Sequence, residues 1–206
     1  YMVNSFKKEK GKFMLIYRYK YELDAVADKF FKCIGELFFT DEVMQTERKA
    51  QGTYIELFLS PKTNDKKMIS CGYAVALNSA DQIKKYSHTF SDVNRMLFDE
   101  FQSETNKYCP DEVKKFISIH QSIARGQGEQ ARYLPVIMIG NPVSLINPYY
   151  VELDICARLR NDTHFLRGDG FVLEQGFNKS ASLAQKESGF NRAFSKNSYI
   201  EYSTEA

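Results

Sequence analysis

The sequence lacks an excess of charge of one sign. Its 206 residues include 28 lysines and arginines and 26 aspartates and glutamates, for a formal net charge of +2. This balance excludes the strongly cationic surface of a protein that coats nucleic acid, although it allows a local basic patch. Hydrophobic residues make up 43% of the chain, enough for one core, which excludes disorder along the whole length.

Long apolar runs and closely spaced cysteines are also missing. No uncharged stretch approaches the roughly 18 apolar residues of a transmembrane helix, so we expect no membrane partner. No signal-peptide pattern follows the first residues. The cysteines are far apart and have no metal-binding spacing: Cys33, Cys71, Cys109 and Cys156. This usage favours a reducing, intracellular compartment.

A further absence concerns nucleotide binding, because the phosphate-binding loop G-x-x-x-x-G-K-[ST] occurs nowhere in the sequence. Residues 1–10 are expected to form a short basic helix, and residues 13–17 a buried strand. These elements normally come just after such a loop. We therefore expect the chain to begin inside a domain, before or within the helix that follows the loop. If residue 1 were the natural start, the missing loop would argue against ATP hydrolysis.

Short apolar runs alternate with amphipathic helices along the first 150 residues. The predicted strands are 13–17, 53–59, 68–77, 95–98 and 136–139, and the predicted helices are 21–37 and 110–124, with 81–91 a helix or loop. Strands 53–59 and 68–77 are expected to pair as a β-hairpin. The alternation predicts an α/β domain with a largely parallel sheet. Beyond it the pattern weakens, and we expect short strands at 151–155 and 171–173 and a helix at 180–194.

The clearest chemical signal is a pair of acids at the end of an apolar strand, Asp99 and Glu100. Nucleotide hydrolysis needs one carboxylate to hold Mg²⁺ and a second to polarise the attacking water. In open parallel sheets, ligands bind outside the carboxyl ends of the strands, which is where this pair is predicted to lie. The alternative is a solvated strand end with no catalytic role.

Two further positions suit phosphate chemistry. Asn141 follows the predicted strand 136–139 and is a candidate sensor of a γ-phosphate, or else a turn residue beside a proline. Arg125 ends a predicted helix before a glycine-rich segment, which suits insertion into a neighbouring active site. It is otherwise a cation that satisfies the helix dipole. Arg132 is an alternative for the same role.

The remaining candidates are basic. Arg18 and Lys20 follow the first predicted strand and either touch nucleotide or face water. Lys84 and Lys85 either contact phosphate, of nucleotide or of DNA, or form part of a solvated surface.

Several segments in the same order resemble one known family, the DNA-packaging ATPases (DNA encapsidation proteins, terminase-like) of small tailed bacteriophages. The segments are 11–23, 96–101, 108–113 and 140–150. They look like the strand after the phosphate-loop helix with its RYKxEL ending, the Walker B strand in MLFDEF, a Y-x-P-x-E-V helix start, and an N-x-V-S-x-x-N-P-Y segment. Their order and spacing are more specific than any one motif.

The resemblance implies a RecA-like P-loop NTPase fold of the additional-strand, catalytic-glutamate (ASCE) type, with a mostly parallel central sheet and an inserted β-hairpin. Residues 1–150 would be the ATPase domain, truncated before or within the helix that follows the phosphate loop. Residues 151–206 would form a lid or linker region. The family's C-terminal nuclease-like domain is not visible in the sequence.

The resemblance also implies roles for individual residues. Asp99 would coordinate the Mg²⁺ of Mg-ATP, and Glu100 would activate water. Arg125 falls where the family carries a trans-acting arginine finger, and Lys85 near a second trans-acting basic residue, with a register ambiguous by one. Asn141 matches the family's sensor or coupling amide.

As partners, the resemblance implies double-stranded DNA, a homo-oligomeric ring (usually a pentamer) and the portal of an empty prohead, in the host cell cytoplasm during virion assembly. With a net charge near zero, DNA contact would come from a few groups that read phosphate. The chain alone is expected to be inactive. Two alternatives stay open: a non-catalytic assembly or nucleic-acid-binding module without the phosphate loop, and another RecA-like DNA translocase or helicase.

Overall fold

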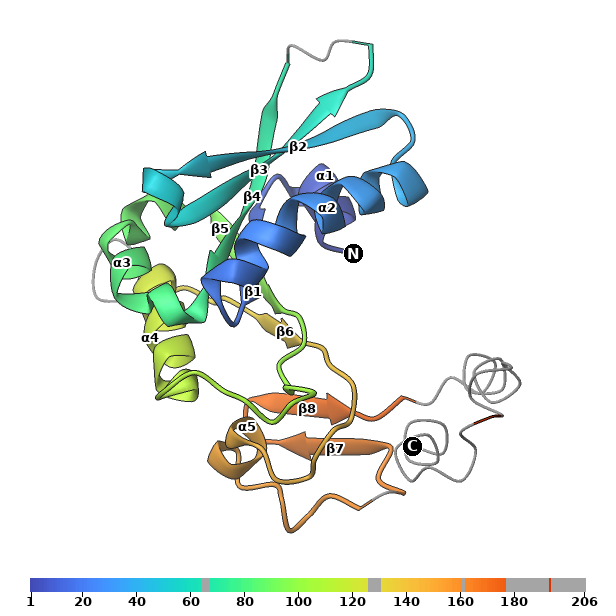
Figure 1. Ribbon diagram of the computed structural model, residues 1–206, viewed down its shortest axis with the longest axis vertical. Coiled ribbons are helices and arrows are strands. Elements are labelled where there is room, and N and C mark those ends of the chain that lie inside the picture. Colours follow the sequence, from blue (N-terminus) through green and yellow to red (C-terminus); the bar gives the residue numbers. More distant parts are fainter. Residues whose placement is uncertain (64–66, 126–130, 161, 177–192, 194–206) are drawn as a thin grey trace. The chain divides into compact units, whose positions relative to one another are not determined.

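The computed structural model describes residues 1–63, 67–125, 131–160, 162–176 and 193 (Figure 1). The chain divides into two compact units, Tyr1–Val143 and Ser144–Ala206. This division comes a little before residue 150, where the sequence predicts the domain boundary. The roles of the two parts, as an ATPase domain and a lid or linker, stay predictions.

The first unit contains most of the regular structure. Its helices and strands are α1 (Met2–Glu9), β1 (Lys12–Tyr17), α2 (Lys20–Phe38), β2 (Glu42–Lys49), β3 (Tyr54–Pro61), β4 (Ile69–Ala76), α3 (Ala80–Lys85), β5 (Val93–Phe98), α4 (Glu112–Ala124) and β6 (Val136–Met138). All the elements predicted from periodicity up to residue 139 are confirmed, because each has a clear helical or strand pattern of its own. One strand, β2, was not predicted.

The described strands of this unit form a six-stranded sheet in the order β2-β3-β4-β1-β5-β6 (Figure 1). Strands β4, β1, β5 and β6 are parallel to one another. Strands β2 and β3 extend the sheet in antiparallel fashion, and the pairing of β3 with β4 confirms the predicted hairpin. The mixed α/β class with a mostly parallel sheet is therefore confirmed, whereas the RecA-like P-loop class stays a prediction.

Strand β2 is not predicted from the sequence because few of its residues are apolar. It lies at the end of the sheet and pairs with β3. Of its residues only Met44 is buried. Helix α2 packs against β2, and Met44 joins the buried cluster there, while the other residues of β2 are half-buried or exposed. A strand with one fully buried residue shows no alternation of apolar and polar residues, so its position comes from its neighbours rather than from its own pattern.

The sheet is covered on both faces. Helices α1 and α2 pack on one face, where Leu23, Ala27 and Phe31 of α2, at helical spacing, join a buried cluster. On the opposite face Phe98 of β5 packs against Phe116 of α4, with ring centroids 5.5 Å apart. Burial on both sides explains why residues 13–17 of β1 are all hydrophobic rather than alternating with polar residues.

The second unit corrects one prediction. Residues 151–155 were expected to form a strand, but α5 spans Pro148–Glu152. The side chain of Asn147 accepts hydrogen bonds from the backbone N–H groups of Tyr149 and Tyr150, and Pro148 occupies the first turn. This cap and proline start a helix and prevail over the β-branched residue that follows.

A small hairpin completes the description of the second unit. It consists of β7 (Phe165–Gly168) and β8 (Phe171–Glu174), which pair in antiparallel fashion. This confirms the strand predicted at 171–173. The helix predicted at 180–194 lies outside the described residues, apart from Ala193. Within the part of the chain that the structure describes, no helix is long and apolar enough to cross a membrane.

Candidate functional site

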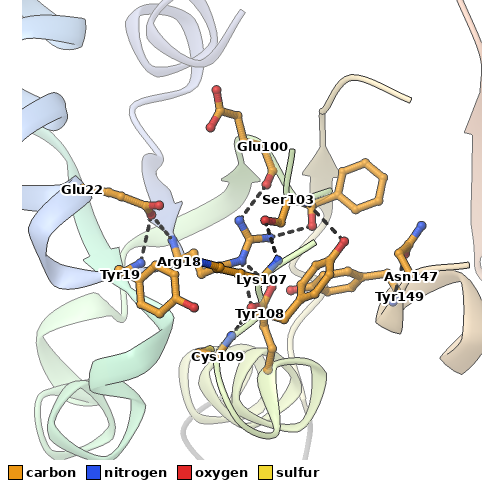
Figure 2. Close-up of polar contacts among 12 residues, drawn as sticks. Arg18, Tyr19, Glu22, Glu100, Ser103, Lys107, Tyr108, Cys109, Asn147 and Tyr149 are labelled. Carbon is orange, nitrogen blue, oxygen red and sulfur yellow. Dashed lines mark hydrogen bonds and ion pairs between the residues drawn. The ribbon is translucent and has the colours of Figure 1, made fainter. Parts of the chain in front are cut away.

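The candidate site lies at the carboxyl edge of the parallel strands. Because β1, β5 and β6 are neighbours and run parallel, the residues that follow them meet at one edge. Arg18 follows β1, the acid pair Asp99–Glu100 follows β5, and Asn141 comes shortly after β6. The close-up in Figure 2 shows the Arg18 side chain reaching the backbone at Glu100.

Arg18 forms a buried ion pair with the carboxylate of Glu112. Its Nε lies 2.9 Å from Oε2 and 3.1 Å from Oε1 of Glu112, and the two side chains are only 5% and 1% exposed. Its Nη1 donates to the carbonyl oxygen of Glu100 (3.2 Å) and its Nη2 to that of Phe101 (2.7 Å). The alternative of a water-facing Arg18 is therefore wrong, whereas contact with nucleotide stays a prediction.

The two acids differ in exposure. The Asp99 side chain is half-buried and Glu100 is exposed. Burial raises the pKa of Asp99, and a hydrogen bond from the Glu100 backbone partly offsets this. Although the Glu100 side chain is exposed, its partial desolvation by the surrounding protein raises its pKa, with further contributions from Asp99, Glu104 and Glu22, while Arg18 acts in the opposite direction. Negative charge is thus disfavoured at the pair, so a cation bound there would relieve repulsion.

Glu100 also has an uncommon backbone conformation. Its φ is 55°, in the left-handed region that side chains other than glycine rarely adopt. Such a residue costs on the order of 1–3 kcal/mol unless its surroundings hold it in place. Here the N–H of Phe101 donates to the carbonyl of Ile139 (3.1 Å), and Arg18 binds the two carbonyls described above. The turn that presents the acids is thereby fixed.

Asn141 is exposed, and its amide nitrogen lies 3.4 Å from a carboxylate oxygen of Glu104. Glu104 is in turn close enough to Glu100 to raise its pKa. The structure thus brings Asn141 near the acid pair through a residue that sequence reasoning missed. No local pattern marks Glu104, which stands in a polar loop after β5.

The two candidate arginines beyond α4 have different surroundings. Arg125 directly follows α4 and is exposed. Arg132 instead donates to the backbone carbonyls of Val93 (2.5 Å), Ile123 (3.0 Å) and Phe90 (3.3 Å). These bonds hold Arg132 within its own chain, whereas the side chain of Arg125 is exposed; the trans-acting role of either arginine stays a prediction. Residues 126–130, between them, lie outside the described part of the chain.

The two lysines at the end of α3 also differ. Lys84 Nζ lies 3.0 Å from Asp81 Oδ1, within the same helix. Lys85 is exposed and, among the residues that the structure describes, has no ion-pair partner. Helix α3 packs against α4, the helix that ends at Arg125. The structure places Lys85 on the helix beside the one that carries Arg125, and its role stays a prediction.

The residues present fit a magnesium ion held mainly by a nucleotide. Within the described ranges, no three His, Cys, Asp or Glu side chains gather as a metal site. Mg²⁺ keeps several waters and usually binds one or two carboxylates together with substrate phosphates rather than an all-protein cage. One half-buried carboxylate at a strand end, Asp99, meets that requirement.

Together these features define a mixed α/β protein whose candidate ligand site, with two acids, lies at the carboxyl edge of a mostly parallel sheet. The family model of the podovirus DNA encapsidation protein (Gp16) matches residues 1–203. The chain belongs to this family.

Individual relatives agree with the family match. The DNA packaging proteins of Bacillus phages PZA and phi29 are each 26% identical over 205 residues, which is 98% of this chain and 55% of each relative. The chain therefore spans about half the length of these curated relatives.

Two solved structures share the fold. The crystal structure of the N-terminal domain of the DNA packaging ATPase from bacteriophage phi29 matches with a TM-score of 0.61 and 22% identity, over 85% of this chain and 80% of that chain. A chain of the phi29 viral genome packaging motor assembly matches with a TM-score of 0.55 and 23% identity, over 100% of this chain and 56% of that chain.

Proposed function

We propose that the intact protein is the ATPase motor subunit that moves viral double-stranded DNA into a prohead. The observation that carries the proposal is the Asp99–Glu100 pair at the end of β5, held by Arg18 at the carboxyl edge of parallel strands. Membership of the DNA encapsidation family supports it. The strand arrangement around this pair also supports a RecA-like P-loop fold of the ASCE type.

In this mechanism Asp99 holds Mg²⁺, which when bound to ATP neutralises charge on the phosphates. Glu100 accepts a proton from the attacking water. Its carboxylate is exposed and so accessible to water, and its raised pKa makes it a stronger base than an ordinary glutamate. Asn141, whose amide nitrogen is near Glu104, is assigned the role of sensing the phosphate that is released. The phosphate-binding loop is not among these 206 residues, so the proposal concerns the intact protein.

The neighbouring subunit completes the site in a ring, which we expect to be a pentamer. Arg125 is exposed at the end of α4 and supplies positive charge to the transferring phosphate of the adjacent subunit. Lys85 acts in trans in the same way. Residues 151–206 serve as a lid or linker.

We expect the ring to work on the portal of the prohead, in the host cell cytoplasm. The net charge of +2 supports DNA contacts through a few basic groups that bind phosphate and read no sequence.

The proposal is tested by Glu100→Gln in the intact protein. The amide keeps the size of the side chain but cannot accept the proton, so ATP hydrolysis should fall by about 10²-fold or more while nucleotide binding persists. Glu36→Gln, an exposed position on α2, is the matched control and should hydrolyse ATP like the wild type. Unchanged ATP turnover in Glu100→Gln would rule out Glu100 as the residue that activates water. If the intact wild-type protein neither binds nor hydrolyses ATP, the non-catalytic module becomes the better account.

A further inference from the structure

The most unusual polar feature of the first unit is the buried ion pair between Arg18 and Glu112. The two side chains are 5% and 1% exposed, and they come from positions 94 residues apart in the chain. Removing two charges from water is costly, and such pairs are weak contributors to stability when compared with apolar side chains of similar volume. Stability alone therefore does not account for this pair, and its role is better inferred from the parts of the fold that it connects.

Hydrogen bonds to neighbouring residues hold the backbone of Arg18 in place. The N–H of Arg18 donates to Oε2 of Glu22 (2.9 Å), and its carbonyl accepts from the N–H of Asn78 (3.1 Å). The guanidinium carbon lies 5.0 Å from the ring centroid of Tyr108 and 5.6 Å from that of Phe98. Both ends of the side chain are thus held, which leaves the guanidinium little freedom to move.

The other end of the guanidinium holds the turn that carries the acids. The two Nη atoms bind the carbonyls of consecutive residues, Glu100 and Phe101. A planar guanidinium sets the directions of several N–H donors at once, whereas the ammonium of a lysine is a single point charge on a flexible chain. Arg18 therefore restrains both the position and the orientation of the peptide that follows Glu100 (Figure 2).

Glu112 connects the same arginine to helix α4. It is the first residue of that helix, and its Oε2 also accepts a hydrogen bond from the N–H of Cys109 (2.9 Å). Helix α4 ends at Ala124, and Arg125 follows directly. One carboxylate thus fixes the start of the helix whose other end carries the candidate trans-acting arginine.

We propose that the Arg18–Glu112 pair is a positioning device that holds the backbone of Glu100 in a fixed place relative to α4. In each subunit, the acids used in its own site and the arginine offered to the next subunit are thereby kept in register. Arg18 is then a positioning residue and not a nucleotide ligand. The proposal rests on the proposed function.

The kinetic test is Arg18→Lys in the intact protein. Lysine keeps the positive charge but cannot bind both carbonyls and the carboxylate, so kcat for ATP hydrolysis should fall by about 10²-fold through misplacement of Glu100, with KM for ATP near the wild-type value. Arg95→Lys is the matched control. Arg95 lies in β5, the strand that the acid pair follows, and is ion-paired with Glu9, so this variant should keep wild-type kcat.

A second measurement does not depend on hydrolysis. Hydrogen–deuterium exchange is followed in the peptide that covers residues 99–103, where the Phe101 amide donates to Ile139. Exchange in this peptide should be faster in Arg18→Lys and unchanged in Arg95→Lys. Glu112→Gln should repeat both effects, and the double variant should be no worse than the single ones, because the two residues act as a unit. If Arg18→Lys does not fold, Glu112→Gln takes its place in both measurements.

The outcomes separate this proposal from the proposed function. If the wild type hydrolyses no ATP, the proposed function fails, and the exchange measurement alone decides whether the pair positions the turn. Unchanged exchange overturns the proposal, and so does faster exchange with unchanged kcat in an active protein. A raised KM with unchanged kcat also overturns it, because it would make Arg18 a nucleotide ligand.

Discussion

At the scale of single residues, the hydrogen-bond partners and the exposure of three arginines determine which role each can have. The guanidinium groups of Arg18 and Arg132 donate hydrogen bonds to groups of their own chain, whereas Arg125 is exposed at a helix end. A guanidinium keeps its charge at any ordinary pH, so its role depends on which acceptors it reaches. The exposed Arg125 is the one of these three that suits a partner outside the chain.

The contrast between Arg125 and Arg132 gives a stability prediction. Arg132→Ala leaves three backbone carbonyls without that partner and should lower the free energy of unfolding by about 1–3 kcal/mol. Arg125→Ala removes an exposed side chain and should change it by no more than about 0.5 kcal/mol. Urea denaturation of both variants measures the difference. Equal losses would contradict the roles given to the two arginines.

At the scale of helices and strands, the site depends on close packing within the parallel sheet. Strand β1 lies between β4 and β5 and pairs with both. It contacts β4 tightly at Gly72, where a Cβ atom would lie 2.4 Å from the backbone carbonyl oxygen of Phe13. Because that neighbour is backbone, it cannot turn aside as a side chain would. The position of β1, and of Arg18 at its end, requires this glycine.

Gly72→Ala should therefore destabilise the first unit by about 1–3 kcal/mol, through the shift that the new methyl group forces on β1. Gly176→Ala is the control, because nothing lies within 4 Å of the Cβ it would add, and it should change stability by no more than about 0.5 kcal/mol. Thermal or urea unfolding of the two variants gives the comparison. A Gly72→Ala protein as stable as the control would show that the strands separate at little cost.

At the scale of the whole molecule, the proposed site is divided between copies of the chain. In the proposed function, Asp99 and Glu100 act at the sheet edge of one subunit, and Arg125 would come from the next. Contacts of this head-to-tail kind close into rings, in which each subunit both receives an arginine and gives one. Activity would then depend on assembly as well as on folding.

Mixing defective subunits tests this arrangement in the intact protein. Arg125→Ala and Glu100→Gln rings should each hydrolyse ATP poorly. In an equimolar mixture, about one interface in four would combine an intact Glu100 with an intact Arg125, so part of the hydrolysis should return. The measurement is steady-state ATP turnover of the mixture against the separate variants. No recovery, or normal turnover by Arg125→Ala alone, would rule out action in trans.

The sequence by itself determined the features that depend on neighbours along the chain. Helical spacing identified α2 and α4, apolar runs identified β1 and β5, and the acids directly after β5 were placed at a strand end. These signals are local, since each comes from residues within a turn or a few strand positions. Where local signals compete, the stronger one prevails, as the Asn147 cap did over the predicted strand at 151–155.

Only the tertiary structure decided which distant groups meet. The pairing of Arg18 with Glu112, the carbonyls that bind Arg132, and the place of β2 beside β3 all depend on which strands and helices become neighbours. No short-range pattern records that choice, because it follows from the packing of the whole unit. The sequence therefore predicted the acids of the candidate site, and the packing determined which residue holds them in place.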